Sequence, residues 1–203
     1  MKVDAPVSRV KEPKLGTKGQ LRKAKVLSVA GAILINEGID NLILRKVAMV
    51  ADIKLGHLQY YFPTRDDLLE ALIYEAWEED EAVLVSASTN EEMLKVVRDL
   101  LVSWGGDRGK IYLVLTLRSL YDERFRLLKQ KIYQGFYEDL MIFLKPLHPE
   151  RSKQELLRQA KMITSLIDGA MVQDHSGSER AIKKQRNDLQ SDLSELVLKL
   201  ILS

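Results

Sequence analysis

Apolar positions recur at helical spacing along most of this chain. In residues 17–36, for example, Val26, Ala30, Ile33 and Leu34 share one face of a helix. Prolines stand only at positions 6, 13, 63, 146 and 149, so long segments are free of helix-breaking residues. Stretches of alternating β-branched residues are scarce, whereas Leu, Ala, Lys, Glu and Gln are plentiful. The pattern therefore predicts an all-α protein.

The same spacing sets the expected bounds of the helices. They are residues 17–36, 44–51, 55–61, 64–85, 90–103, 110–121, 122–144, 150–174 and 183–202. Gly38 suits the C-cap of the first helix, and Thr64 and Asp67 have the spacing of a capping box at the start of the fourth. Breaks are predicted at 105–109, 146–149 and 175–178, where Gly, Pro and Ser gather.

Residues 47–69 carry the clearest functional signal. They predict a short helix, a tight turn, a second short helix and the capped start of a third, which is the outline of a helix-turn-helix. Leu58 and Phe62 are four residues apart and are expected to face a small core. The other expected core residues are Val47, Ala48, Val50, Ala51, Leu68, Leu69 and Leu72.

The second short helix is crowded with side chains that hydrogen-bond and stack. His57 and Gln59 offer donors and acceptors to base edges, and Gly56 lets the backbone approach DNA closely. Tyr60 and Tyr61 suit phosphates or thymine methyl groups. The alternative is an aromatic core cluster, which explains Phe62 but not three successive aromatic residues that cannot all face one way. This helix is therefore predicted to enter the major groove.

Charge is divided unevenly along the chain, although the net charge is only +2. Residues 1–65 hold twelve Lys and Arg against five Asp and Glu, while residues 66–203 hold nineteen against twenty-four. An ordinary basic tail is one explanation, and a polyanion-binding end is the other. The cations expected to contact the DNA backbone are Lys18, Arg22, Arg45, Lys46 and Arg65.

Residues 17–70 resemble the N-terminal domain of the TetR family of bacterial transcriptional regulators. The matching residues are Leu44-Arg45-x-Val47-Ala48-x-x-Ala51 and Gly56-x-Leu58-x-x-Tyr61-Phe62-x-Thr64-Arg65-x-x-Leu68-Leu69. The resemblance implies a basic arm (1–16), a three-helix DNA-binding domain (17–65) and a larger helical domain for effector binding and dimerisation (66–203). It also implies a homodimer on a palindromic operator, with small-molecule release as the usual control and repression as the usual direction.

The family pattern also assigns individual positions. It implies that residues Lys54, Leu55, Gly56 and His57 enter the major groove, and it adds Thr64 to the DNA-binding surface. The chain departs from the pattern at Asp52, where glycine is usual, at Ile43 and Lys54, where a capping Ser or Thr is common, and at Gln59, where tyrosine is common. These departures are expected to change operator sequence or affinity rather than to abolish binding.

The residues after 66 are less informative. An effector pocket is predicted from aromatic residues, leucines and methionines, although the same residues fill any helical core: Tyr74, Trp77, Met93, Trp104, Tyr112, Leu115, Leu120, Phe136, Leu140 and Met162. Two apolar stripes are predicted to form the dimer, with packing inside the subunit as the alternative: Leu156, Ala160, Ile163 and Ile167, and Leu189, Leu193, Leu196 and Leu200. The acidic run at 75–81 is expected to be a solvated face, with a site for a cationic ligand or a metal ion as the alternative.

Composition limits the other classes of function. The chain has no cysteine, no run long enough to span a bilayer, and no apolar segment of a signal peptide at its start, so a cytoplasmic protein without membrane contact is expected. Its three histidines are scattered, and no metal motif, phosphate loop or nucleophile elbow appears. An enzyme is therefore disfavoured, and no metal or cofactor is expected. The remaining alternative is a DNA-binding dimer that is blind to effectors or controlled by a partner protein.

Overall fold

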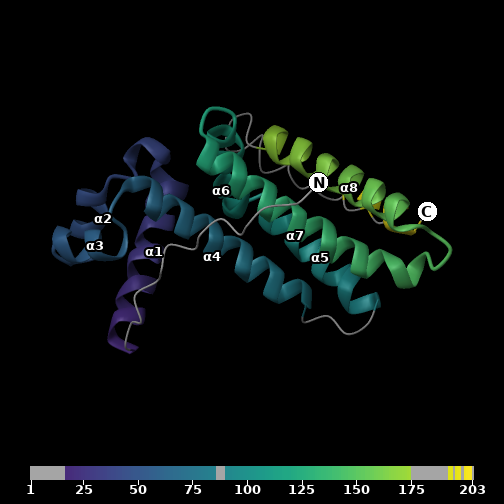
Figure 1. The fold of residues 1–203 in the computed structure, drawn as a ribbon, viewed down its shortest axis with the longest axis horizontal. Coiled ribbons are helices and arrows are strands. Elements are labelled where there is room, and N and C mark those ends of the chain that lie inside the picture. Colours follow the sequence, from purple (N-terminus) through teal and green to yellow (C-terminus); the bar gives the residue numbers. More distant parts are fainter. Residues whose placement is uncertain (1–16, 86–89, 175–191, 194, 198, 203) are drawn as a thin grey trace, which may run out of the picture. The chain divides into compact units, whose positions relative to one another are not determined.

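The computed structural model describes residues 17–85, 90–174, 192–193, 195–197 and 199–202. Helices dominate these residues and no strand occurs among them, which confirms the predicted all-α class (Figure 1). The chain divides into two compact units, residues 1–73 and 74–203. The helix α4 (Arg65–Val85) contributes residues to both units. The predicted basic arm, residues 1–16, lies outside the described residues.

The first unit contains α1 (Thr17–Glu37), a 3-10 turn η1 (Ile39–Asn41), α2 (Leu44–Val50), α3 (Leu55–Tyr61) and the start of α4. Its buried residues are Val26, Leu27, Ala30, Ile33, Leu34, Leu42, Val47, Ala48, Ala51, Leu58, Phe62, Leu68, Leu69, Leu72 and Ile73. The predicted core is confirmed except at Val50, whose side chain is 53% exposed. The prediction was wrong there because Val47, Ala48 and Ala51 already form the inner face of α2, and Val50 points away from it.

The start of α4 is held by the predicted capping box. The backbone N–H and the hydroxyl of Thr64 donate to Asp67 Oδ2 at 2.9 and 2.7 Å, and the backbone N–H of Asp67 donates to Thr64 Oγ1 at 3.1 Å. Asp therefore replaces the usual Glu or Gln without loss of the reciprocal bonds. The box fixes where the chain turns from α3 into α4.

The second unit contains the rest of α4, α5 (Asn90–Trp104), α6 (Asp107–Ser119), α7 (Glu123–Leu147) and α8 (Lys153–Asp174). Residues 192–193, 195–197 and 199–202 are also helical, within the predicted last helix. In Figure 1, α7 runs alongside α8, and the two helices pack against each other. Among the described residues, no helix is both long and apolar enough to cross a membrane.

One predicted break is shorter than expected, and the break predicted at 146–149 lies at 148–152 instead. Only Gly105 and Gly106 interrupt the chain between α5 and α6, because Asp107 already lies in the first turn of α6. At the other break, α7 continues through Pro146 to Leu147. Proline removes one backbone donor, and here it stands in the last turn of the helix, where His148 still closes a bond to the Leu144 carbonyl at 3.0 Å.

The two predicted dimer stripes are largely buried inside the second unit. One core cluster contains Leu101, Phe143, Leu144, Leu156, Ile163, Ile167, Leu193, Val197 and Ile201, and Ala160 is also fully buried. Leu200 packs against the cluster, Leu196 is exposed, and Leu189 lies outside the described residues. These helices are amphipathic because they close their own core, which is the alternative that the sequence left open.

Polar side chains fasten the last helix to this core. His148, a buried residue, forms a hydrogen bond through Nε2 with the Ile201 carbonyl oxygen at 2.7 Å. The side-chain amide of Gln159 donates to the Leu200 carbonyl, and Arg151 donates to Gln159 Oε1 at 2.6 Å. Two carbonyls near the end of a helix thus find partners that helical bonding cannot supply.

Candidate nucleic-acid interface

Helix α3 has one anchored face and one open face. Leu58 and Phe62 are 0% and 3% exposed and fix the helix to the core of the first unit. His57, Gln59 and Tyr60 lie on the open side, all of them exposed. This separation is what four-residue spacing of apolar side chains produces on a helix of only seven residues.

The three successive aromatic residues diverge as the sequence predicted. Phe62 is buried, Tyr61 is half-buried, and Tyr60 is 65% exposed. The Tyr60 and Tyr61 rings meet edge to face with centroids 5.4 Å apart. The Tyr61 ring therefore restricts the rotamers of Tyr60 at the end of α3. Less conformational entropy is then lost if Tyr60 contacts a ligand.

The entry to α3 differs from the usual pattern in two ways. Lys54 occupies the N-cap with an extended backbone and makes no side-chain capping bond, so the bond that a Ser or Thr would supply at this position is missing. Asp52 adopts φ 53°, the left-handed conformation that the usual glycine would adopt without strain. The turn between α2 and α3 is thus kept, at the cost of a strained aspartate.

Gly56 keeps the first turn of α3 bare. A Cβ built on this residue would meet no atom within 4 Å, so packing inside the unit does not demand glycine. The absence of a side chain instead leaves the backbone accessible at the point where the helix presents its free N–H groups. A bare backbone of this kind allows close approach of a phosphate or a base edge.

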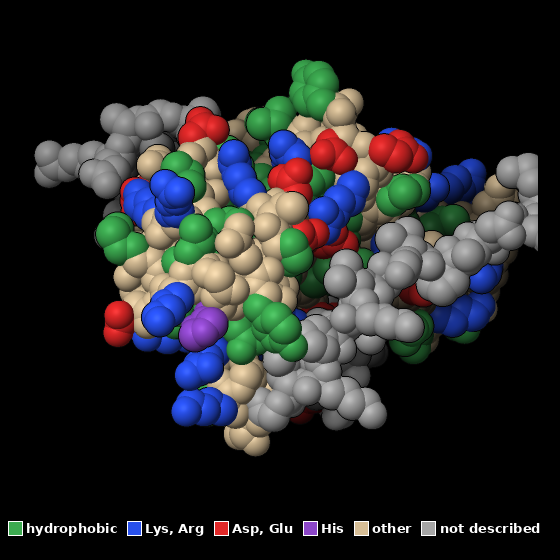
Figure 2. All heavy atoms as spheres, turned by 60° about the vertical axis from the view of Figure 1, so that its left-hand side comes forward, with side chains coloured by type: hydrophobic (Ala, Val, Ile, Leu, Met, Phe, Trp, Pro, Cys, Tyr) green, Lys and Arg blue, Asp and Glu red, His purple; other side chains and the backbone are tan. Residues whose placement is uncertain are grey.

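The cations predicted to contact DNA differ in their exposure and in their bonding partners. Arg45, Lys18 and Arg22 are exposed, and Figure 2 shows Lys and Arg side chains distributed over the face that it presents. Lys46 forms an ion pair with Glu37. Arg65 is half-buried and donates through Nη2 to the Ile39 carbonyl at 2.7 Å, so it also holds η1 in place.

A hollow of about 490 Å³ opens beside the starts of α2 and α3. It is lined by Ile43, Leu44, Arg45, Leu55, Gln59 and Arg65. Four of these residues were predicted to contact DNA: Arg45, Gln59 and Arg65 from their residue types and positions, and Leu55 from the family resemblance. The sequence did not indicate that Ile43 also lines this hollow, because an isoleucine at an N-cap position suggests only that the side chain cannot form a capping bond.

The residues predicted to line an effector pocket are packed in different ways. Leu115 is fully buried, Trp104 and Tyr112 stack edge to face on Phe136, and Tyr74 lies against Trp77. Leu140 packs against the core cluster, whereas Met162 and Leu120 are 59% and 68% exposed. The side chain of Met93 lies outside the described residues. A ligand role for this set stays a prediction.

A buried carboxylate joins two of these aromatic residues. Asp80, only 2% exposed, accepts hydrogen bonds from Trp104 Nε1 at 2.8 Å and from the Tyr112 hydroxyl at 2.7 Å. Arg108 Nε lies 3.5 Å from the other carboxylate oxygen and also pairs with Glu79. Burial raises the pKa of Asp80, and its hydrogen-bond donors oppose this shift without cancelling it.

The acidic run at 75–81 is therefore not a uniform solvated face. Glu78 and Glu79 are exposed as expected, but Asp80 is inside the helical bundle of the second unit. No group of carboxylates or histidines suited to a metal ion occurs in the part of the chain that the structure describes. The sequence did not predict the contacts of Asp80 and Glu79 with Arg108, because Arg108 is nearly thirty positions away along the chain.

Comparisons with known proteins agree with a helix-turn-helix in an all-helical fold. No family model matches the chain. It is 41% identical over 61 residues to an uncharacterised helix-turn-helix transcriptional regulator encoded in the 5′ region of dhlA in Xanthobacter autotrophicus, covering 30% of each chain. It is 30% identical over 86 residues to YttP of Bacillus subtilis, named a helix-turn-helix transcriptional regulator, covering 39% of this chain and 42% of that one. The chain thus matches less than half the length of these curated relatives.

Solved structures match over most of the chain. A TetR-family member from Streptomyces coelicolor has a TM-score of 0.64 at 22% identity, covering 88% of this chain and 97% of that one. A proposed transcriptional regulator from Saccharomonospora viridis, solved in complex with choline, has a TM-score of 0.67 at 19% identity, covering 85% and 95%. At such identities the likeness establishes the fold.

Proposed function

We propose that this chain, which has the all-helical TetR fold with an N-terminal helix-turn-helix, is a transcriptional regulator that binds operator DNA. The observation that carries the proposal is the division of α3. Leu58 and Phe62 lock the helix to the core, while His57, Gln59 and Tyr60 stand exposed. Exposed amide, imidazole and phenol groups on a rigidly held helix are suited to base edges and phosphates. The proposed site of action is the cytoplasm.

The proposed assembly is a homodimer on a palindromic operator. Support comes from the outer face of α8, where Met162, Gly169 and Val172 are exposed on one side of the helix. Leu196 and Leu202 are exposed on the last helix. Because the inner stripes close the subunit's own core, these outward residues are the ones offered to a second copy. Two reading helices would then meet successive major grooves.

The proposed control is release by a small organic effector bound in the second unit. The S. viridis neighbour, solved with choline, is a precedent for a small ligand on this fold. Helix α4 contributes to both units, so a shift of α4 caused by the effector is the proposed route to the DNA-binding helices. By linkage, operator DNA must weaken effector binding by the same factor.

DNA binding can be tested with the full chain and genomic fragments enriched for binding, measured by fluorescence anisotropy. Replacing His57 and Gln59 together by Ala is expected to weaken the selected site at least ~10-fold, because each lost base contact is worth about 1–3 kcal/mol. The Lys95→Ala substitution in α5 is the control and should leave affinity unchanged. Equal affinity of the double variant and the parent would refute this reading surface.

A further inference from the structure

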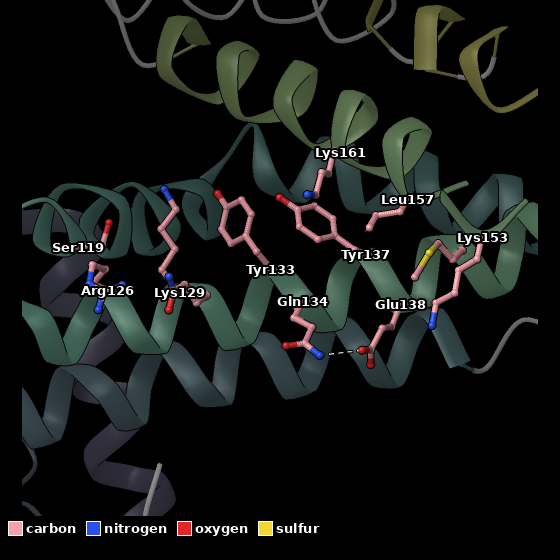
Figure 3. Close-up of a pocket in the computed structure, with 12 residues that line it drawn as sticks. Ser119, Arg126, Lys129, Tyr133, Gln134, Tyr137, Glu138, Lys153, Leu157 and Lys161 are labelled. Atoms are coloured by element: carbon pink, nitrogen blue, oxygen red, sulfur yellow. Dashed lines mark hydrogen bonds between the residues drawn. The ribbon is translucent and has the colours of Figure 1, made fainter. Parts of the chain in front are cut away.

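A groove of about 540 Å³ lies along α7 and α8 of the second unit (Figure 3). None of the residues predicted for the effector pocket lines it. Its lining is Ser119, Arg126, Lys129, Gln130, Tyr133, Gln134, Tyr137, Glu138, Met141, Lys153, Leu157 and Lys161. The volume is that of a small-molecule site rather than of a single water or ion.

The middle of the groove is apolar and aromatic. Tyr133 and Tyr137 lie one helical turn apart on α7, with Leu157 of α8 nearby in the same view (Figure 3). The Tyr133 hydroxyl donates to Asp168 at 2.8 Å, which fixes the orientation of that ring. Burial raises the pKa of Tyr133, so the phenol stays neutral at physiological pH. The groove thus offers a preset flat surface to an apolar body.

The ends and edges of this surface are cationic. Arg126 and Lys129 come from α7, and Lys153 and Lys161 come from α8, against the single carboxylate of Glu138 in the lining. Glu138 accepts a hydrogen bond from Gln134 at 2.9 Å, and Arg126 pairs with Glu123 outside the groove. Within the described ranges, neither Lys129, Lys153 nor Lys161 forms an ion pair.

Two of these lysines already sit over aromatic rings of the groove. Lys129 Nζ lies 5.0 Å from the centroid of the Tyr133 ring, and Lys161 Nζ lies 5.8 Å from that of Tyr137. Figure 3 shows Lys161 directed from α8 toward Tyr137. Such contacts hold a cation at a defined place, from which it can donate charge-assisted hydrogen bonds to an anion without leaving its ring.

We propose that this groove binds a small organic anion: a molecule with a flat or aliphatic body and one carboxylate or sulfonate head. The body would lie on Tyr133, Tyr137 and Leu157, and the head would accept hydrogen bonds from Lys129 and Lys161. The same lining disfavours an organic cation, because four cationic side chains and only one carboxylate line the groove. Binding itself does not depend on DNA; its role as the releasing signal rests on the function proposed above.

Three probes with one body and different charges test the proposal. They are 2-naphthoate, 2-naphthamide and 2-naphthylmethylammonium, titrated by calorimetry into the full-length protein without DNA. Naphthoate is expected to bind at least ~10-fold more tightly than the amide, and the cation least. Equal binding of all three probes, or binding of none, would overturn the assignment.

Variants then locate the site. Lys129→Gln together with Lys161→Gln is expected to reduce naphthoate affinity about 10-fold and to leave the amide within about two-fold, since only charge is removed. Lys95→Gln, on α5 and outside the groove, should change neither. Unchanged naphthoate affinity in the double variant, with circular dichroism confirming its fold, would place the anion elsewhere and reject the proposal.

A separate titration with bound operator fragments distinguishes the two proposals. If naphthoate binds the groove and the chain does not bind DNA, the anion site stands and the regulatory function falls. If the chain binds DNA but none of the three probes binds, the regulatory function stands and the anion site falls. Release of DNA by naphthoate, lost in the Lys129→Gln, Lys161→Gln variant, would support both.

Discussion

The two units of this molecule handle polar side chains in opposite ways. In residues 17–73 every fully buried side chain is apolar or glycine, and the hydrogen-bonding residues of α3 face outward. The described part of the second unit instead buries Asp80, His148, Gln159 and Thr164. The first unit is built to present polar groups on a fixed surface, whereas the second uses them inside to set which helices meet. Substitutions of buried polar residues in the second unit should therefore reduce stability. Substitutions of exposed polar residues on α3 of the first unit should reduce DNA affinity instead.

The largest effect is expected at Asp80. Asp80→Leu leaves the Trp104 indole N–H and the Tyr112 hydroxyl buried without their acceptor, and each such loss costs about 1–3 kcal/mol. A loss of about 3 kcal/mol in the free energy of unfolding is expected in urea titrations. Asp80→Asn keeps an acceptor oxygen and should lose clearly less. On the first unit, Gln59→Ala should change stability by less than about 0.5 kcal/mol. Similar losses for Asp80→Leu and Gln59→Ala would remove the contrast between the units.

Two helical glycines give the next test. A Cβ on Gly135 of α7 would lie 2.8 Å from Trp77 Cζ2 and 3.4 Å from Trp77 Cε2, and the indole nitrogen of this ring is buried. Gly135→Ala should cost about 1–3 kcal/mol through overpacking. On Gly31 of α1 a Cβ would lie 3.4 Å from Leu72 Cδ1, an ordinary contact, so Gly31→Ala should be neutral or stabilise by up to about 1 kcal/mol. Thermal unfolding of both variants measures the difference, which the opposite order would contradict.

Buried acids should also make the second unit sensitive to pH. The pKa values of Asp80 and Asp168 are raised, in both cases chiefly by burial, so the folded state binds protons at a higher pH than the unfolded chain does. Their contribution to stability therefore grows as pH falls from above the raised folded pKa values toward the ordinary value of about 4. Each group contributes at most about 1.4 kcal/mol per pH unit.

The measurement is the free energy of unfolding at several pH values between neutral and mildly acidic conditions. The Asp80→Asn, Asp168→Asn double variant should show a smaller gain on acidification than the parent. The comparison between parent and variant cancels the surface carboxylates whose pKa values are lowered, which act in the opposite direction. An identical pH profile in the variant would show that these two acids do not titrate differently on folding.

The sequence was most informative about features that depend only on neighbouring residues of one helix. The spacing of Leu58 and Phe62, the capping pair of Thr64 and Asp67, and the divergence of Tyr60 from Phe62 are local consequences of helix geometry, and all are present. Partners far apart in the chain were beyond such reasoning. Nothing local indicates that Arg108 meets Asp80 or that Tyr133 meets Asp168. Apolar stripes on α8 indicated burial, but periodicity does not reveal whether a helix meets its own subunit or another.

The smallest expected effect lies at the helix caps of the first unit, where the chain departs from the TetR-family pattern that it resembles. Ile43 is the N-cap of α2 and makes no side-chain capping bond, so its β-conformation is already suited to a residue that does. Ile43→Thr should supply a hydroxyl to the free N–H groups of α2 and stabilise the protein by about 0.5–1 kcal/mol. Because Ile43 is 51% exposed, little apolar burial is lost in exchange.

Lys54→Thr is the matched change at the N-cap of α3, and it separates the two roles of that position. It should give a similar gain in stability, measured as a shift in the urea midpoint, because Lys54 also makes no capping bond. Unlike Ile43→Thr, it removes a cation from the helix proposed to read DNA, so the salt dependence of operator binding should fall by about one in slope. A gain in stability with an unchanged salt slope would mean that Lys54 lies away from the phosphates. In that case only the uncharged side chains on the exposed face of α3 would remain for the proposed contacts with DNA.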